Sequence, residues 1–210
     1  MKLYTYSPAP NPLRVEIFLK EKGESIETIE VDLMSGAQFD ADFTAINPLH
    51  TVPALQLGDG TVLAQVPAIC EYLESVYPAK PLLGTTPRER AEIKEWCHRI
   101  FMEGITAIAN VFRNRSPAFA GRAVPGPVKC EQIPALIERG TICLDAWYKT
   151  MNAHLAGREF VVGDSFTMAD IDAVVACNFA LWIKQPIPDH CEHLKQWYDF
   201  VSTRPSVVSG

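Results

Sequence analysis

The sequence predicts an α+β domain with a mixed four-stranded sheet, followed by an all-helical domain. Strand and helix patterns alternate in the order β-α-β-(α)-β-β-α, and this order is complete by about residue 78. Beyond residue 87 the strand patterns disappear and long helical patterns follow. A change from mixed to purely helical patterns indicates two domains. We place them at residues 1–78 and 88–210, with a linker at 79–87.

The spacing of apolar residues places the elements of the first domain. In chain order we expect a strand, a helix, a strand, a short irregular helix, two strands and a helix, at residues 2–6, 13–22, 26–33, 35–45, 52–57, 61–63 and 67–77. Prolines at positions 8, 10 and 12 end the first strand, because proline fixes φ and lacks an N–H. The turn Gly58-Asp59-Gly60 joins the last two strands as a hairpin.

The second domain contains four helical patterns, at residues 88–112, 132–156, 167–183 and 193–202. The segment 113–128 is rich in proline and glycine, so we expect a loop there. Thr167 followed by Asp170 is a capping-box pattern, which predicts a helix start stabilised by about 1 kcal/mol.

Composition excludes several classes of function. The chain has a net charge of -6, so phosphate backbones and anionic lipids would repel it, and we expect no nucleic-acid or membrane partner. No apolar run reaches the roughly 18 residues of a spanning helix, and the first residues lack the apolar region of a signal peptide. We therefore expect a cytoplasmic protein. The 6 cysteines and 5 histidines show no metal-ligand spacing, so no metal site is expected.

Two segments of the first domain begin helices in a way that favours anions. The turn Ser7–Leu13 leads into the first helix, and Gln65-Val66-Pro67 leads into the last helix of that domain. Backbone N–H groups and the helix dipole favour a negative charge at such a start, and a thiol held there ionises more easily. The alternative for the first segment is a proline-stiffened loop without a ligand.

A third segment, Asn47 to Leu55, contains Val52-Pro53 at the start of a strand. A proline there leaves a ladder donor missing, unless the peptide bond is cis and the backbone of Val52 faces a ligand. In that arrangement the N–H and C=O of Val52 would pair with an extended peptide. His50 could contact a carboxylate nearby, or could be a solvated loop residue.

These segments make the chain resemble the cytosolic glutathione transferases over essentially its whole length. The resemblance rests on Val52-Pro53-Ala54-Leu55 and on the helical second half. It rests also on the helix entry with Ala68-Ile69, followed after two intervening residues by Tyr72-Leu73. The runs Ser7–Val15 and Phe166–Ile171 are similar to the second fungal transferase type and its bacterial relatives. The resemblance implies a thioredoxin-like first domain, glutathione as cosubstrate, a homodimer and a role in detoxification.

The resemblance also implies roles for individual residues in binding glutathione. The cysteinyl backbone of glutathione would pair with Val52 before Pro53, and the γ-glutamyl group would lie at Gln65 and Val66. His50 would lie near the glycyl carboxylate. Most relatives carry an acidic residue and a serine at the helix entry. The neutral Gln65 and the missing hydroxyl at Val66 should therefore weaken binding, the latter by roughly 1 kcal/mol.

The group that activates the thiol is less evident. The position of the catalytic Ser, Tyr or Cys of many relatives falls on Ala9 or Pro10, and the Ser and His that hold a water in the fungal type correspond to Ala109 and Arg113. The Arg113 cation could favour the thiolate directly. Candidate catalytic residues are Ser7, Asn11 and Arg113.

We expect the second domain to supply an apolar pocket for the electrophile. Its candidate residues are Phe101, Asn110, Phe112 and Ser116. The leading hypothesis is a glutathione transferase that conjugates the thiolate to small hydrophobic electrophiles. The alternatives are a binding protein of the same fold with little activity, and a specialised glutathione-dependent lyase, dehalogenase or isomerase.

Overall fold

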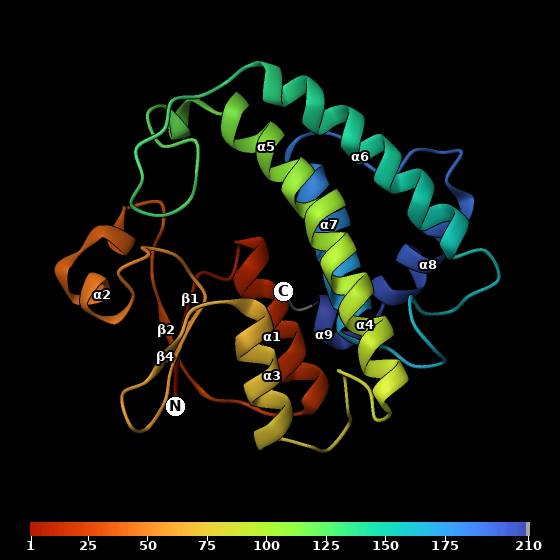
Figure 1. Ribbon diagram of the computed structural model, residues 1–210, viewed down its shortest axis with the longest axis horizontal. Helices are drawn as coiled ribbons and strands as arrows, with labels where there is room; N and C mark the ends of the chain where they lie inside the picture. The colour runs from red at the N-terminus through yellow and green to blue at the C-terminus, as the bar shows by residue number, and fades with distance from the viewer. Residues whose placement is uncertain (209–210) are drawn as a thin grey trace. The chain divides into compact units, whose positions relative to one another are not determined.

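The computed structural model of the protein describes residues 1–208 (Figure 1). The chain forms two compact units. Among the described residues, the first unit holds Met1–Pro81 and also Val124–Val128, whereas the second holds Leu82–Ala123 and residues 129–208. The segment 124–128, which the sequence assigned to the helical domain, therefore packs with the first unit. Its position depends on long-range packing that a local pattern does not report.

The first unit is a mixed sheet with helices, as predicted. Its elements are β1 (Lys2–Thr5), α1 (Pro10–Lys22), β2 (Glu27–Glu30), η1 (Ala37–Phe39), α2 (Ala41–Ile46), β3 (Ala54–Gln56), β4 (Val62–Leu63) and α3 (Val66–Val76). The four strands lie in the order β2-β1-β3-β4. Strand β1 is parallel to β2 and antiparallel to β3, and β3 is antiparallel to β4.

Helices α1 and α3 pack side by side (Figure 1). Apolar residues of α1 such as Ile17 and Phe18 are fully buried, as are Ile69 and Leu73 of α3. An ion pair between Lys22 and Glu74 also joins the two helices. This packing links α1 to α3 within the first unit.

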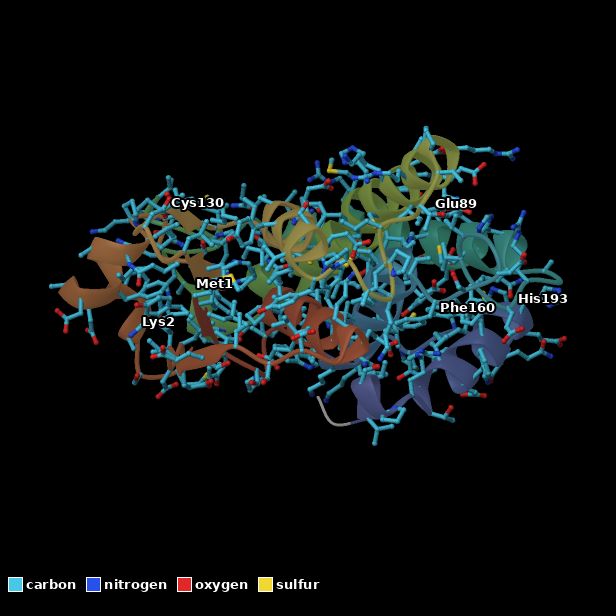
Figure 2. The ribbon with its side chains drawn as sticks, turned by 90° about the horizontal axis from the view of Figure 1, so that it is seen from below. Met1, Lys2, Glu89, Cys130, Phe160 and His193 are labelled. Carbon is cyan, nitrogen blue, oxygen red and sulfur yellow. The ribbon has the colours of Figure 1, made fainter. Side chains whose placement is uncertain are left out.

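The second unit is helical. Its elements are α4 (Pro87–Arg99), η2 (Ile100–Ile105), α5 (Thr106–Arg115), η3 (Pro117–Phe119), α6 (Ala135–His154), α7 (Met168–Trp182), α8 (Glu192–Ser202) and α9 (Pro205–Val208). Helix α4 begins with a capping box between Thr86 and Glu89, the latter labelled in Figure 2. Helix α7 is buried over almost its whole length and packs against α4, η2, α5 and α8.

The predicted capping box at the start of α7 is confirmed. The buried carboxylate of Asp170 accepts hydrogen bonds from the N–H and the hydroxyl of Thr167, at 3.0 and 3.1 Å. It also accepts from the N–H of Val161 at 2.9 Å and from the indole N–H of Trp197 at 3.1 Å. One carboxylate thus joins the start of α7 to the preceding loop and to α8.

The long helix predicted over 88–112 is not uniform. Between α4 and α5 the backbone forms a π-helical segment, η2, and α5 continues to Arg115. Gly104 of this segment lies against the buried indole of Trp147, so close that a Cβ at position 104 would lie 2.8 Å from Trp147 Cε2. The Thr106 hydroxyl donates to the Phe101 carbonyl at 2.9 Å within the widened turn. The apolar pattern predicts the helix, but it does not report the extra residue in its turn.

Candidate functional site

The start of α1 offers one backbone donor. Pro10 and Pro12 have no N–H, and the N–H of Leu13 is bonded to the carbonyl of Ala9 at 3.1 Å. Within residues 1–208 the N–H of Asn11 has no hydrogen-bond partner. An anion at the positive end of this helix would therefore meet the N–H of Asn11.

The side chain of Asn11 is oriented by the helix itself. Arg14 Nη1 donates to Asn11 Oδ1 at 3.2 Å, so the carbonyl end of the amide is occupied. The Nδ2 amide group remains as a donor. Asn11 is exposed and Arg14 is buried, which leaves the predicted catalytic residue accessible to a ligand. Asn11 can thus direct both a backbone and a side-chain donor toward a sulfur.

Ser7, the second catalytic candidate, has a partner that the sequence did not reveal. Its hydroxyl donates to Glu16 Oε1 at 3.1 Å, and the hydroxyl of Thr5 donates to the same oxygen at 2.6 Å. Glu16 lies on α1, nine residues beyond Ser7. The Ser7 proton is therefore directed at a carboxylate rather than at a ligand. These contacts favour a role for Ser7 in fixing the turn between β1 and α1.

The peptide bond between Val52 and Pro53 is cis, as expected from the sequence. Strand β3 starts directly after it and is paired on both sides, with β1 and β4. In contrast, no hydrogen bond among residues 1–208 uses the N–H or the C=O of Val52. Both groups can accept an extended ligand in the manner of an added strand.

The loop before Val52 is built around the buried side chain of Asn47. Its Oδ1 accepts from the N–H of Leu49 at 3.1 Å, and its Nδ2 donates to the carbonyl of Thr51 at 2.8 Å. The N–H of His50 donates to the carbonyl of Asn47 at 3.0 Å. These hydrogen bonds hold the loop together and position His50 and Val52.

His50 is partly buried and has a left-handed backbone, with φ of 54°. Its Nε2 lies 3.4 Å from the hydroxyl of Thr44, and its ring meets the ring of Phe39 edge-on at 5.3 Å. Its Nδ1 is buried without a hydrogen-bond partner. The same holds for Oε1 of Gln38, a residue that is 8% exposed as a whole. Buried polar atoms without partners are rare unless a ligand or water pairs with them. No sequence pattern singled out Gln38.

The start of α3 presents unpaired donors. Gln65 is the N-cap but its side chain makes no capping hydrogen bond, and within residues 1–208 the N–H of Val66 has no partner. Gln65 is exposed, whereas Val66 is buried. Pro67 in the first turn needs no partner because it has no N–H. This helix start can bind a carboxylate through backbone N–H groups and leaves the Gln65 amide available to a ligand.

Arg113 of the second unit is engaged with its own loop. Its Nε donates to the carbonyl of Ala123 at 2.9 Å, and Nη2 donates to the carbonyl of Arg122 at 3.0 Å. The guanidinium also lies over the ring of Phe119, 4.3 Å from its centre. Burial, and then the nearby Arg122 cation, lower the pKa of Arg113. These contacts favour a role in holding the loop after α5 rather than in stabilising a thiolate.

The residues predicted for the electrophile pocket all lie on η2, on α5 or at its end. Phe112 belongs to an aromatic cluster with Phe119, Phe179 and Trp182, whose ring centres lie 5.1–5.7 Å from its own. Of the four rings in this cluster, only Phe112 is among the residues predicted for the pocket.

The other three predicted pocket residues have different environments. Phe101 lies on the π-helical segment and is 39% exposed. The carbonyl of Asn110 accepts from Asn114 at 2.8 Å, and the carbonyl of Ser116 accepts from Gln132 at 2.7 Å. Asn110 and Ser116 thus use their main chains to support α5 and the loop that follows it.

No group of three or more His, Cys, Asp or Glu side chains within residues 1–208 is arranged to hold a metal ion. In the same range, no helix combines the length and the apolar character needed to cross a membrane.

Comparison with known proteins identifies the family. Residues 9–76 match the glutathione S-transferase N-terminal domain, and residues 141–209 match the glutathione S-transferase C-terminal domain. Glutathione S-transferase 2 of Saccharomyces cerevisiae is 33% identical over 99% of this chain and 88% of its own length.

Solved structures agree. The crystal structure of Gtt2 from Saccharomyces cerevisiae has a TM-score of 0.89 at 32% identity, covering 100% of this chain and 99% of that chain. A glutathione S-transferase domain-containing protein from Marinobacter aquaeolei VT8 has a TM-score of 0.88 at 38% identity, covering 99% of this chain and 100% of that chain. The relative from yeast and the matches in both halves show that the chain belongs to the glutathione S-transferase family.

Proposed function

We propose that the protein binds glutathione along Val52-Pro53 and the start of α3, and conjugates its thiolate to small hydrophobic electrophiles. The observation that carries this proposal is the set of unpaired main-chain groups at Asn11, Val52 and Val66. All three belong to the first unit, where β3 and the packing of α1 on α3 fix their positions.

Each part of glutathione has a partner of suitable chemistry. The cysteinyl N–H and C=O would pair with Val52, and the γ-glutamyl carboxylate would accept from the N–H of Val66. Gln65 Oε1 would accept from the γ-glutamyl ammonium group. The glycyl carboxylate would lie near His50, whose buried Nδ1 lacks a partner and can donate to a carboxylate when it carries the ring hydrogen.

The sulfur would lie at the start of α1, where Asn11 supplies an N–H and the Nδ2 amide group. In the reaction the S–H proton passes to solvent, and the thiolate sulfur forms a bond to an electrophilic carbon. A leaving group departs from that carbon with its electron pair. Donors held in place before the reaction stabilise the thiolate without reorganisation, and binding of both reactants supplies orientation. The aromatic cluster around Phe112 would hold the apolar part of the electrophile.

A second candidate is a binding protein with little transferase activity. The observation that favours it is the lack of a hydroxyl donor at Ala9 and Pro10, combined with a Ser7 hydroxyl that already donates to Glu16. Titration calorimetry with glutathione, followed by an assay with a chlorodinitrobenzene, separates the two. A dissociation constant of about a millimolar or lower with turnover supports the transferase, and binding without turnover supports the binding protein.

The homodimer and the role in detoxification that the resemblance implies remain predictions. Sedimentation velocity of the purified protein tests the first, because a single species of one-chain mass would contradict it.

A further inference from the structure

The loop between α5 and α6 contains a closed projection, which we call the strap and define as residues 121–130. Its two ends are joined, because the N–H of Ala123 donates to the carbonyl of Cys130 at 2.8 Å and the N–H of Cys130 donates to the carbonyl of Gly121 at 3.1 Å. Cys130 is labelled in Figure 2. Arg113 donates to the carbonyls of Arg122 and Ala123 and so holds the first of these two ends. The strap is therefore held at both ends.

The tip of the strap, Val124-Pro125-Gly126-Pro127-Val128, belongs to the first unit. The prolines on both sides of Gly126 fix φ at positions 125 and 127 and so restrict the backbone of the tip. Gly126 has φ of +95°, and a Cβ built at this position would lie 3.3 Å from the carbonyl oxygen of Leu49. The strap thus meets the backbone of the loop before Val52 at a place where an added Cβ would make a tight contact, which the Leu49 carbonyl could relieve only by moving.

The contacted peptide is the one that joins Leu49 to His50. Asn47 holds the other side of this loop through the N–H of Leu49 and the carbonyl of Thr51. The Leu49–His50 peptide is therefore flanked along the chain by two groups that Asn47 holds, and its carbonyl oxygen faces the tip of the strap. Displacing this peptide would move the imidazole of His50, whose Nδ1 is buried without a partner.

We propose that the strap is a positioning element for the glycyl end of the thiol substrate, acting through His50. The inference rests on the proposed function and goes beyond it, because it assigns a share of substrate selection to residues 124–128. It predicts that the strap matters for glutathione, which has a glycyl carboxylate, and not for γ-glutamylcysteine, which lacks that group.

The test is Gly126→Ala, with Gly60→Ala as the matched control. Gly60 has a similar φ of +89° but nothing within 4 Å of its Cβ position, so the control carries the backbone strain without the contact. Titration calorimetry measures the dissociation constants of glutathione and γ-glutamylcysteine for each protein. We expect Gly126→Ala to weaken glutathione roughly tenfold and to leave γ-glutamylcysteine within about twofold. Gly60→Ala should change neither.

His50→Ala provides the second arm. If the strap acts through His50, adding Gly126→Ala to His50→Ala should cause no further loss of glutathione affinity. Equal weakening of both thiols by Gly126→Ala, full additivity with His50→Ala, or unchanged glutathione binding would each overturn this inference while leaving the proposed function intact. A wild-type protein that binds neither thiol would overturn the proposed function and this inference with it.

Discussion

Arg14 Nη1 donates a hydrogen bond to Asn11 Oδ1 across 3.2 Å. Arg14 is 3% exposed, whereas Asn11 is exposed at the start of α1. Because a guanidinium only donates, this bond occupies the oxygen of the Asn11 amide and leaves Nδ2 as the group that meets a ligand. The side-chain amide of Asn11 can both accept and donate. With its oxygen bonded to Arg14, it acts as a donor at the place where the sulfur of glutathione is proposed to lie.

Replacing Asn11 should therefore impair thiolate formation. We expect Asn11→Ala to raise the pKa of the bound glutathione thiol by about one unit, because a hydrogen bond to a charged group contributes roughly 1.5–3 kcal/mol and the backbone N–H remains. The measurement is thiolate absorbance against pH in the binary complex. Asn11→Asp places a negative charge there and should raise this pKa further. An unchanged titration in both variants would remove Asn11 from thiol activation.

Introducing a negative charge at position 65 should tighten glutathione binding. Gln65 is exposed and makes no capping hydrogen bond, so Gln65→Glu should leave the fold undisturbed. A carboxylate accepts more strongly than an amide from the γ-glutamyl ammonium group, and we expect roughly fivefold higher affinity. Calorimetry at low and high salt should show that the gain shrinks as salt rises. No gain at low salt would place the γ-glutamyl group elsewhere.

Removing the Asp170 carboxylate should destabilise the second unit. Asp170→Ala leaves the buried N–H of Val161 and the indole N–H of Trp197 without acceptors, besides the donors of Thr167. We expect a loss of at least about 3 kcal/mol in the free energy of unfolding, measured by urea denaturation. Asp164→Ala is the control because Asp164 is exposed on the same loop. Equal stability of the two variants would contradict the role assigned to this carboxylate.

Asp170 also predicts a pH dependence of stability. Burial raises its pKa from 3.8 to about 6, although its hydrogen bonds partly lower it. The folded state thus binds the proton more tightly than the unfolded state. The contribution of Asp170 is therefore greatest below about pH 4, falls by about 3 kcal/mol as pH rises to about 6, and is constant above.

Asp170→Asn tests this dependence because the amide does not titrate. The difference in free energy of unfolding between wild type and Asp170→Asn should shift in favour of the variant as pH rises from about 4 to about 6. Parallel curves over that range would contradict the raised pKa.

The π-helical segment predicts a further effect on stability. Gly104→Ala would place a Cβ 2.8 Å from Trp147 Cε2 in a fully packed region. We expect a loss of about 1–3 kcal/mol in the free energy of unfolding. Gly58→Ala, where nothing lies within 4 Å of the Cβ position, should change stability little. If Gly104→Ala left the free energy of unfolding unchanged, the helix would be able to shift away from the indole without cost, and the expected effect would be contradicted.

Local patterns predict much of this fold for identifiable reasons. The change from alternating to helical spacing gives the two-part architecture, and Thr167 with Asp170 gives the start of α7, because both signals are confined to a few neighbouring residues. The cis bond at Val52-Pro53 was also expected, since a proline there conflicts with an ordinary strand start.

Other features depend on contacts between distant segments. Glu16 pairs with Ser7 and Thr5 across the turn between β1 and α1, and the geometry of that turn is not readable from a local pattern. The tip of the strap packs with the first unit, although its sequence resembles any loop rich in proline and glycine. The buried Oε1 of Gln38 becomes visible only when burial is known. These residues give no sequence signal because their partners are set by tertiary packing.

The central claim is that the main-chain groups of Asn11, Val52 and Val66 form one site for glutathione. Amide NMR of the isotopically labelled protein during titration with glutathione tests it most directly, because it reads each of these N–H groups separately. We predict that their three signals shift together with one dissociation constant, while amide signals of α8 do not move. Saturating glutathione that leaves all three signals in place would contradict the account.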